Sequence, residues 1–285
     1  MTISAREAAP AILLVDNGSL ESAATLSLRD VASRLASTLS LPVEPVSLLH
    51  SDAIPAGQLD SRPAETLVPA LERRLESGVN DFLVAPLFFG PSGALTGYLP
   101  GRIALLKARH PRLRVRVAPP LVDAGDAQDT RMADILASQV RAALPAGETA
   151  PAVILVDHGS PVRSVTQVRD HLASQLQARL GRAVPRVLAA SMERRPGPDY
   201  AFNEPLLEDA LDQPGFNTGT VIVALLFLSP GRHAGPGGDI AGICAAAERR
   251  HPALKTIMTR PVGSHPGLIP ILVDRIHAGL GRPAV

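Results

Sequence analysis

The strongest constraint on the fold of this chain is a repeat within it. Residues 11–19 read AILLVDNGS and residues 152–160 read AVILVDHGS. This match places Asn17 opposite His158 at an offset of 141 residues. Such a period is far longer than the repeats of solenoid proteins, so it indicates the duplication of a whole domain.

The same offset aligns later segments of the chain, including residues 109–111 and 250–252, which both read Arg-His-Pro. A length of 285 residues also suits two domains of ordinary size. We therefore predict one domain at residues 1–144 and a second at residues 151–285, with a linker at residues 145–150.

Each half alternates short apolar runs with segments of helical periodicity. Residues 152–156 form an apolar run typical of a strand buried on both faces, and the apolar residues from Val165 to Leu180 recur at helical spacing. Strands that alternate with helices favour a mostly parallel sheet covered on both sides. We predict an α/β fold of two duplicated domains, each with a doubly wound, mostly parallel sheet, that face a central cleft. In the second half we expect strands at 152–156, 185–190, 221–228 and 255–258, and helices at 165–180, 204–211, 240–250 and 268–280.

Composition excludes several classes of function. Lys and Arg total 28 against 27 Asp and Glu, and only 3% of residues are aromatic, so no nucleic-acid partner is expected. No apolar stretch is long enough to cross a membrane. The single cysteine, Cys244, and the absence of a secretory signal at residues 1–10 favour the cytoplasm.

Potential ligands follow three expected strands of the second half. His158 follows the first strand, Glu193 follows the second, and His233 lies in a loop rich in Gly and Pro after the third. Ligands bind at the carboxyl ends of parallel strands, so these side chains are expected to converge. Two imidazoles and one carboxylate suit a divalent ion such as iron, cobalt, nickel or zinc.

Each of these residues also has a purely structural interpretation. A histidine at a strand end often bonds a backbone carbonyl, and Glu193 beside two arginines is compatible with a surface ion pair. Their joint position at three strand ends is what favours a functional site.

These residues resemble the class II chelatase family, which includes sirohydrochlorin cobaltochelatase and siroheme ferrochelatase. The resemblance covers essentially the whole chain in its two-domain form. Its motifs are Val156-Asp157-His158-Gly159-Ser160, the strand 221–228 running into Gly231-Arg232-His233, Gly238-Asp239-Ile240, and Arg260-Pro261-Val262-Gly263-Ser264-His265-Pro266.

The resemblance implies a lyase that inserts Co²⁺, Fe²⁺ or Ni²⁺ into sirohydrochlorin or a related tetrapyrrole for siroheme or cobalamin biosynthesis. It assigns metal binding and catalysis to His158, His233 and Glu193. The divalent metal is a substrate, and no organic cofactor is expected.

A sirohydrochlorin-type ring carries eight carboxylates, which guanidinium groups can bind in pairs of hydrogen bonds. Arg163, Arg194, Arg195 and Arg232 lie in the same loops, and we predict that they bind substrate together with Ser160. Simple solvation of these arginines is the alternative.

The first half departs from the pattern of the family. Asn17 stands where the second half has His158, and the loop at residues 90–97 contains no histidine. We predict that the first half has lost metal binding. The duplicated chain is expected to act as a monomer with an internal pseudo-two-fold axis.

Three other interpretations of the sequence differ in how well the residues support them. A non-catalytic protein that binds or delivers a tetrapyrrole or a metal would keep the same fold. A hydrolase using Ser160 with His158 is disfavoured because residues two apart on a turn rarely meet correctly for proton transfer, and no Gly-x-Ser-x-Gly motif is present. A dinucleotide fold at residues 235–238 is excluded by the spacing of its glycines.

Overall fold

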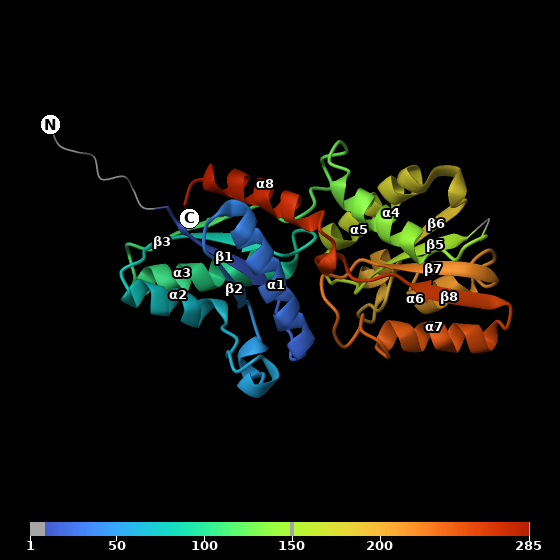
Figure 1. Cartoon of the computed structure of the whole chain (residues 1–285), viewed down its shortest axis with the longest axis horizontal. Helices are drawn as coiled ribbons and strands as arrows, with labels where there is room; N and C mark the ends of the chain where they lie inside the picture. The colour runs from blue at the N-terminus through green and yellow to red at the C-terminus, as the bar shows by residue number, and fades with distance from the viewer. Residues whose placement is uncertain (1–8, 149–150, 285) are drawn as a thin grey trace.

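The computed structural model describes residues 9–148 and 151–284. These residues form two four-stranded parallel sheets, with strand orders β2-β1-β3-β4 and β6-β5-β7-β8 (Figure 1). The two orders are the same after renumbering, so the halves share one topology. The predicted α/β fold is confirmed.

The first part of the chain contains β1 (Ala11–Asp16), α1 (Ser22–Leu39), β2 (Val43–Ser47), η1 (Ser51–Ala53), η2 (Ala56–Gln58), α2 (Leu67–Glu76), β3 (Asp81–Pro86), the π-helical turn η3 (Ala94–Tyr98), α3 (Leu99–Arg109), β4 (Arg114–Val117) and α4 (Arg131–Ala143). The second part contains β5 (Ala152–Asp157), α5 (Arg163–Leu180), η4 (Gly181–Ala183), β6 (Arg186–Ser191), η5 (Pro198–Asn203), α6 (Leu207–Asp212), β7 (Gly219–Leu225), α7 (Asp239–Arg250), β8 (Leu254–Met258), η6 (Val262–Ser264) and α8 (Leu268–Leu280).

Two predicted elements of the second half are shorter than expected. The strand predicted to reach residue 228 ends at Leu225, because the carbonyls of Phe227 and Leu228 accept hydrogen bonds from the turn η6 instead of from the sheet. The helix predicted from residue 204 begins at Leu207. Leu206, just before it, is extended and forms an isolated bridge with Ser191 at the end of β6.

Side chains of each strand alternate between two apolar layers. In β5, Val153 and Leu155 point into the layer that α4 and α5 cover, whereas Ile154 and Val156 point into the layer of α6 and α7. The period of two along a strand produces this division. Both layers are apolar, which explains why the strand reads as one continuous apolar run.

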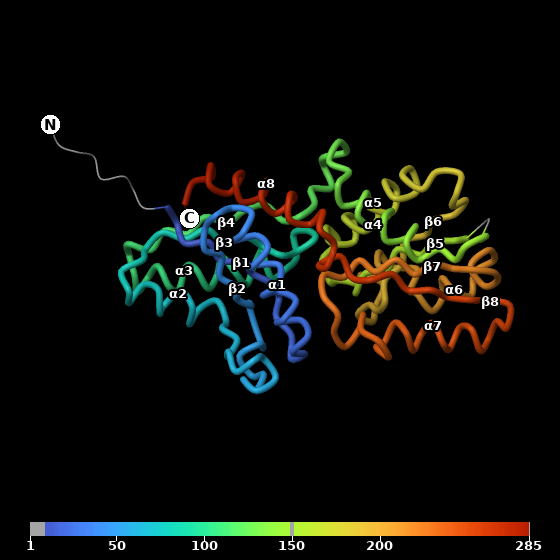
Figure 2. The backbone as a smooth tube through the Cα atoms, in the orientation of Figure 1, coloured from blue at the N-terminus to red at the C-terminus, as the bar shows by residue number. Residues whose placement is uncertain are grey.

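The last helix of each sequence half packs on the sheet of the other half. Helix α4 contacts α5 and β7, whereas α8 returns to contact β3, β4 and α1. Figure 1 shows α8 in red above the first sheet, and Figure 2 traces the return of the chain from β8. The Arg275 guanidinium fixes α8 there, donating hydrogen bonds to the Leu121 carbonyl at 2.9 Å and to Asp129 at 2.7 Å.

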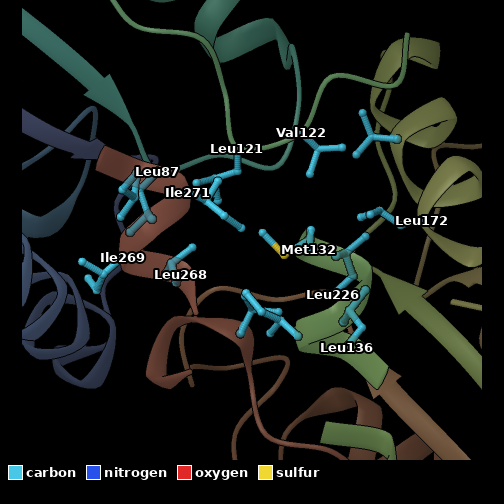
Figure 3. Packing of buried hydrophobic residues seen from close by; sticks show 14 of the residues in the cluster. Leu87, Leu121, Val122, Met132, Leu136, Leu172, Leu226, Leu268, Ile269 and Ile271 are labelled. Atoms are coloured by element: carbon cyan, nitrogen blue, oxygen red, sulfur yellow. The ribbon is translucent and has the colours of Figure 1, made fainter. Parts of the chain in front are cut away.

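We call this arrangement, in which α4 and α8 each pack on the sheet of the other half, the helix exchange. It joins the two halves through one hydrophobic core. The largest buried cluster contains residues of both sheets, among them Leu83 and Leu155, and residues of both exchanged helices. Figure 3 shows Met132 and Leu136 of α4 near Leu226, with Leu268 and Ile271 of α8 on the other side of the same cluster. The predicted ranges 1–144 and 151–285 therefore separate the two sheets but not their helical layers.

Some sequence predictions fall outside the described residues. One is the prediction that residues 1–10 lack a secretory signal, because residues 1–8 are not described. The other is the predicted linker at residues 145–150, of which residues 149–150 are not described. Among the helices of the described part of the chain, none is both long and apolar enough to cross a membrane.

Candidate metal centre

The three predicted metal ligands lie at the carboxyl ends of three adjacent strands. His158 follows the central strand β5, Glu193 follows β6 on one side, and His233 lies between β7 and α7 on the other side. The imidazole rings of His158 and His233 meet edge to face, with ring centroids 4.8 Å apart. The fold thus brings together residues that are 75 positions apart in the sequence.

Both imidazoles are held through Nδ1. His158 Nδ1 lies 3.2 Å from the Gly159 carbonyl, and His233 Nδ1 lies 2.6 Å from Asp239 Oδ2. A carbonyl or carboxylate oxygen can only accept, so Nδ1 carries a proton in each ring, and in a neutral imidazole Nε2 then has the lone pair. Metal-binding histidines commonly show this arrangement, in which the second nitrogen fixes the tautomer and the ring orientation.

Glu193 completes the group. Its Oε1 lies 3.6 Å from His158 Nε2, and both side chains are about half exposed. Among residues 9–148 and 151–284, no three histidine, cysteine or acidic side chains already surround one point as a finished metal site. An ion bound here would need small rotations of the exposed His158 and Glu193 side chains.

Asp239 is a site residue that the sequence prediction missed. It is the first residue of α7, and its carboxylate contacts His233 as well as Arg232, whose Nε lies 3.7 Å away. A carboxylate behind a ligand histidine orients the ring and raises its basicity. The segment Gly238-Asp239 was part of the family motif, but six residues of sequence separation gave no sign that the two side chains meet.

The backbone under His158 depends on a glycine. Gly159 has φ +89°, and a Cβ at this position would lie 1.9 Å from the Glu193 carbonyl oxygen. The Glu193 amide in turn donates to the His158 carbonyl at 3.2 Å. The loops that carry His158 and Glu193 therefore touch through their backbones, which only glycine at position 159 permits.

Ser160 is used by the backbone of its own loop. Its Oγ accepts the Val162 amide hydrogen at 3.0 Å, just before α5 begins at Arg163. A hydroxyl used in this way stabilises a helix start. This contact leaves the predicted role of Ser160 in substrate binding untested.

Arg194 differs from the other predicted substrate-binding arginines, because it folds back onto its own loop. It forms an ion pair with Glu204 at 2.8 Å and donates to the carbonyls of Arg195 and Gly197. These contacts assign it a part in holding the loop after β6.

The other three arginines are exposed at the site. The Arg163 guanidinium lies 4.6 Å from the centre of the Phe202 ring, and that of Arg195 lies 5.9 Å from the Tyr200 ring. The Arg232 side chain is 76% exposed. Their guanidinium groups remain accessible to an anionic ligand.

The corresponding strand ends of the first half line a cavity of about 260 Å³. Asp16 at the end of β1 and Asn17 and Ser19 of the following loop contribute to it, and Leu228 and Ser229 contribute from the second half. Residues of both halves thus line one cavity, and the predicted cleft between the two sets of strand ends stays a prediction. The lining contains no imidazole.

Comparison with known proteins finds that the second half of the chain is similar to chelatases. Residues 152–278, which carry all three predicted ligands, match the CbiX family. A stretch of 130 residues is 31% identical to the chloroplastic sirohydrochlorin ferrochelatase of Arabidopsis thaliana, covering 45% of this chain and 52% of that protein. The chain therefore spans about half the length of this curated relative.

Solved structures match over nearly the whole chain. SirB from Bacillus subtilis with Fe³⁺ superposes with a TM-score of 0.67 at 19% identity, covering 95% of this chain and 96% of the other. The sirohydrochlorin chelatase SirB from Bacillus subtilis subspecies spizizenii in complex with cobalt gives 0.67 at 17% identity, covering 96% and 98%. At these identities, the comparison establishes that both halves together have the fold of these proteins.

Proposed function

We propose that this chain is a member of the class II chelatase family, which its second half resembles, and that it inserts a divalent metal ion into sirohydrochlorin or a related tetrapyrrole. The observation that carries the proposal is the pair His158 and His233, whose Nε2 atoms are both free to bind while their Nδ1 atoms are held. Glu193 stands beside them as a third ligand or base.

Metal insertion requires that the ion lose water and that the ring lose two pyrrole protons. A neutral imidazole can act both as ligand and as proton acceptor near neutral pH. His158 and His233 hold the incoming ion in this proposal, and the exposed carboxylate of Glu193 accepts a proton or completes the ligand set.

The accessible arginines bind the ring. Arg163, Arg195 and Arg232 have exposed guanidinium groups and lie within a few residues of the three candidate ligands in the sequence. In this proposal they pair with carboxylates of the tetrapyrrole. This set of ligands accepts Co²⁺, Fe²⁺ and Ni²⁺ alike, so supply in the cell would decide between siroheme and cobalamin biosynthesis. The cytoplasm stays the expected location, and a monomer the expected state.

The experiment is an absorbance assay with sirohydrochlorin and each metal in turn. We expect His158→Ala and His233→Ala to reduce turnover at least a hundredfold, and Glu193→Ala to have a milder effect. His110→Ala, at the matched helix end of the first half, is a control that should leave turnover unchanged. Binding of metal and tetrapyrrole without turnover by the wild type would favour the alternative of a delivery protein.

A further inference from the structure

A fully buried arginine lies beneath the loop that carries His158. Arg169 of α5 is 2% exposed. Its Nη1 donates to Ser191 Oγ at 2.6 Å and to the Asn203 carbonyl at 2.9 Å, and its Nε donates to Asp170 at 2.9 Å. Burying a charged group is unfavourable unless its hydrogen bonds are satisfied, and here each nitrogen has a partner.

A chain of hydrogen bonds connects Arg169 to the His158 loop. The Ser191 hydroxyl donates to Asp157 Oδ1 at 2.7 Å, and the same oxygen accepts the Gly159 amide hydrogen at 3.1 Å. Arg169 Nη1 lies 3.8 Å from this oxygen. The carboxylate of Asp157 is thus held from below and in turn holds the backbone on the far side of His158.

Asn203 holds the other end of the loop. Its Oδ1 accepts from the Ser160 amide at 2.9 Å and from the Thr166 hydroxyl at 3.3 Å, and its Nδ2 donates to the Ser160 and Tyr200 carbonyls. Every hydrogen-bonding position of this buried amide is used. Because Arg169 binds the Asn203 carbonyl, both ends of the His158 loop depend on one guanidinium.

The first half provides an internal comparison. Strand pairing places Asp16 beside Ser47, as it places Asp157 beside Ser191. The residue that matches Arg169 at the offset of 141 is Leu28. Asp16 keeps a buried carboxylate oxygen for which the described residues supply no hydrogen bond. The half that lacks the histidine therefore also lacks the buried arginine.

We propose that Arg169, acting through Asp157, Ser191 and Asn203, is a positioning residue that fixes the His158 loop for metal binding. The proposal rests on the proposed function, in which His158 is a metal ligand. Arg169 itself touches neither metal nor tetrapyrrole. Its effect is to keep the loop in the one conformation that places His158 beside His233.

The test compares matched serines in the two halves. Ser191→Ala removes the hydroxyl that bridges Arg169 and Asp157 and leaves only their ion pair at 3.8 Å, whereas Ser47→Ala removes the same hydroxyl from the first half. We expect Ser191→Ala to weaken Co²⁺ binding about 10- to 100-fold, the usual effect of removing a partner behind a metal ligand. It should also change the visible absorption spectrum of bound Co²⁺. Ser47→Ala should change neither.

A second variant replaces Arg169 by leucine, the residue that the first half has at the matching position 28. Arg169→Leu combined with Asp157→Asn removes the guanidinium without leaving a buried carboxylate unpaired. We expect faster hydrogen exchange at the amides of Gly159 and Ser160 in the metal-free protein, and a fall in kcat with little change in the KM for tetrapyrrole.

Two outcomes separate this inference from the proposed function. Unchanged exchange, Co²⁺ affinity and Co²⁺ spectrum in a folded Ser191→Ala variant of an active enzyme would overturn the positioning role alone. If the wild type inserts no metal but exchange at Gly159 and Ser160 still depends on Arg169, the proposed function fails and the control of the loop by Arg169 stands.

Discussion

A buried aspartate shows how the two halves differ at the scale of single residues. Asp16 and Asp157 end matching strands, but Arg169 faces only Asp157, because the first half has Leu28 at that position. Burial raises the pKa of both carboxyl groups, and that of Asp16 to about 6. A hydrogen bond with a serine opposes the rise in each half, but only Asp157 also has the opposing charge of Arg169. The ionised form of Asp16 therefore destabilises the folded protein at neutral pH.

This carboxylate makes stability depend on pH. Folded Asp16 holds its proton more tightly than an unfolded aspartate does, so its contribution to the free energy of unfolding is full below pH 3.8 and is lost as the pH rises through about 6. We expect Asp16→Asn to be more stable than the wild type at pH 7.5, by on the order of 2 kcal/mol, and this advantage to shrink toward pH 4. Urea unfolding at both pH values measures it. The exposed Asp52→Asn serves as control, and a gain independent of pH would contradict the assignment.

The arginines of the site give a second prediction at this scale. Arg232→Ala should raise the KM for tetrapyrrole more than it lowers kcat, because it removes binding that substrate and transition state share. Arg194→Ala should instead lower the melting temperature, because Arg194 forms an ion pair with Glu204 and a hydrogen bond to the Gly197 carbonyl of its own loop. Steady-state kinetics and thermal unfolding of both variants test this. Unchanged kinetics for Arg163, Arg195 and Arg232 variants would leave these arginines without a role in binding.

The sequence predicted where the candidate ligands lie better than it predicted the residues that support them. His158, Glu193 and His233 were expected to lie near one another because each follows an apolar run, and strand ends of a parallel sheet meet. Arg169 was missed because its hydrogen bonds depend on how α5, β6 and η5 lie in space. Asp239 was missed because its contact with His233 depends on the path of the loop between β7 and α7. Periodicity marks Arg169 only as one residue of a helix.

At the scale of elements, periodicity predicted which segments are strands and helices but not which sheet each helix covers. Helices α4 and α8 are amphipathic in sequence, and nothing in an apolar stripe identifies its partner. Helix α8 meets the first sheet so closely that Gly279 has no room for a side chain. A Cβ there would lie 2.8 Å from the Ala118 Cβ and from a Leu83 methyl group.

Two glycines in helices provide a matched pair. We expect Gly279→Ala to destabilise the protein by about 1–3 kcal/mol, because the added methyl group overpacks the contact with β3 and β4. Gly242→Ala in α7 meets open space and should stabilise it by up to about 1 kcal/mol through helix propensity. Chemical denaturation measures both. A neutral or stabilising Gly279→Ala would show that α8 does not pack there in solution.

At the scale of the whole molecule, the exchange of α4 and α8 makes one folding unit from a duplicated sequence. The repeat predicted two domains because it reports descent from one ancestral unit. It carries no information on helix exchange, which depends on the shared core between the sheets. The division into domains at residues 1–144 and 151–285 remains a prediction, and the shared core is a reason to expect that neither part folds alone.

Separate fragments test this point. Fragments 1–148 and 151–285, produced alone, should show no cooperative unfolding, because each presents an apolar sheet face that a helix of the other fragment covers. Produced together, they should associate into a complex with the circular dichroism of the intact chain. A stable monomeric 151–285 fragment would contradict the single core.

The central claim is that metal is handled by the second half alone. A crystal structure of the protein soaked with Co²⁺ tests it most directly, because anomalous scattering locates the ion without reference to activity. We expect cobalt bonded to Nε2 of His158 and of His233 at about 2.1 Å, the usual distance for a metal bound to imidazole. Cobalt beside Asp16 and Asn17, with the two histidines unoccupied, would place the site in the first half and contradict the account.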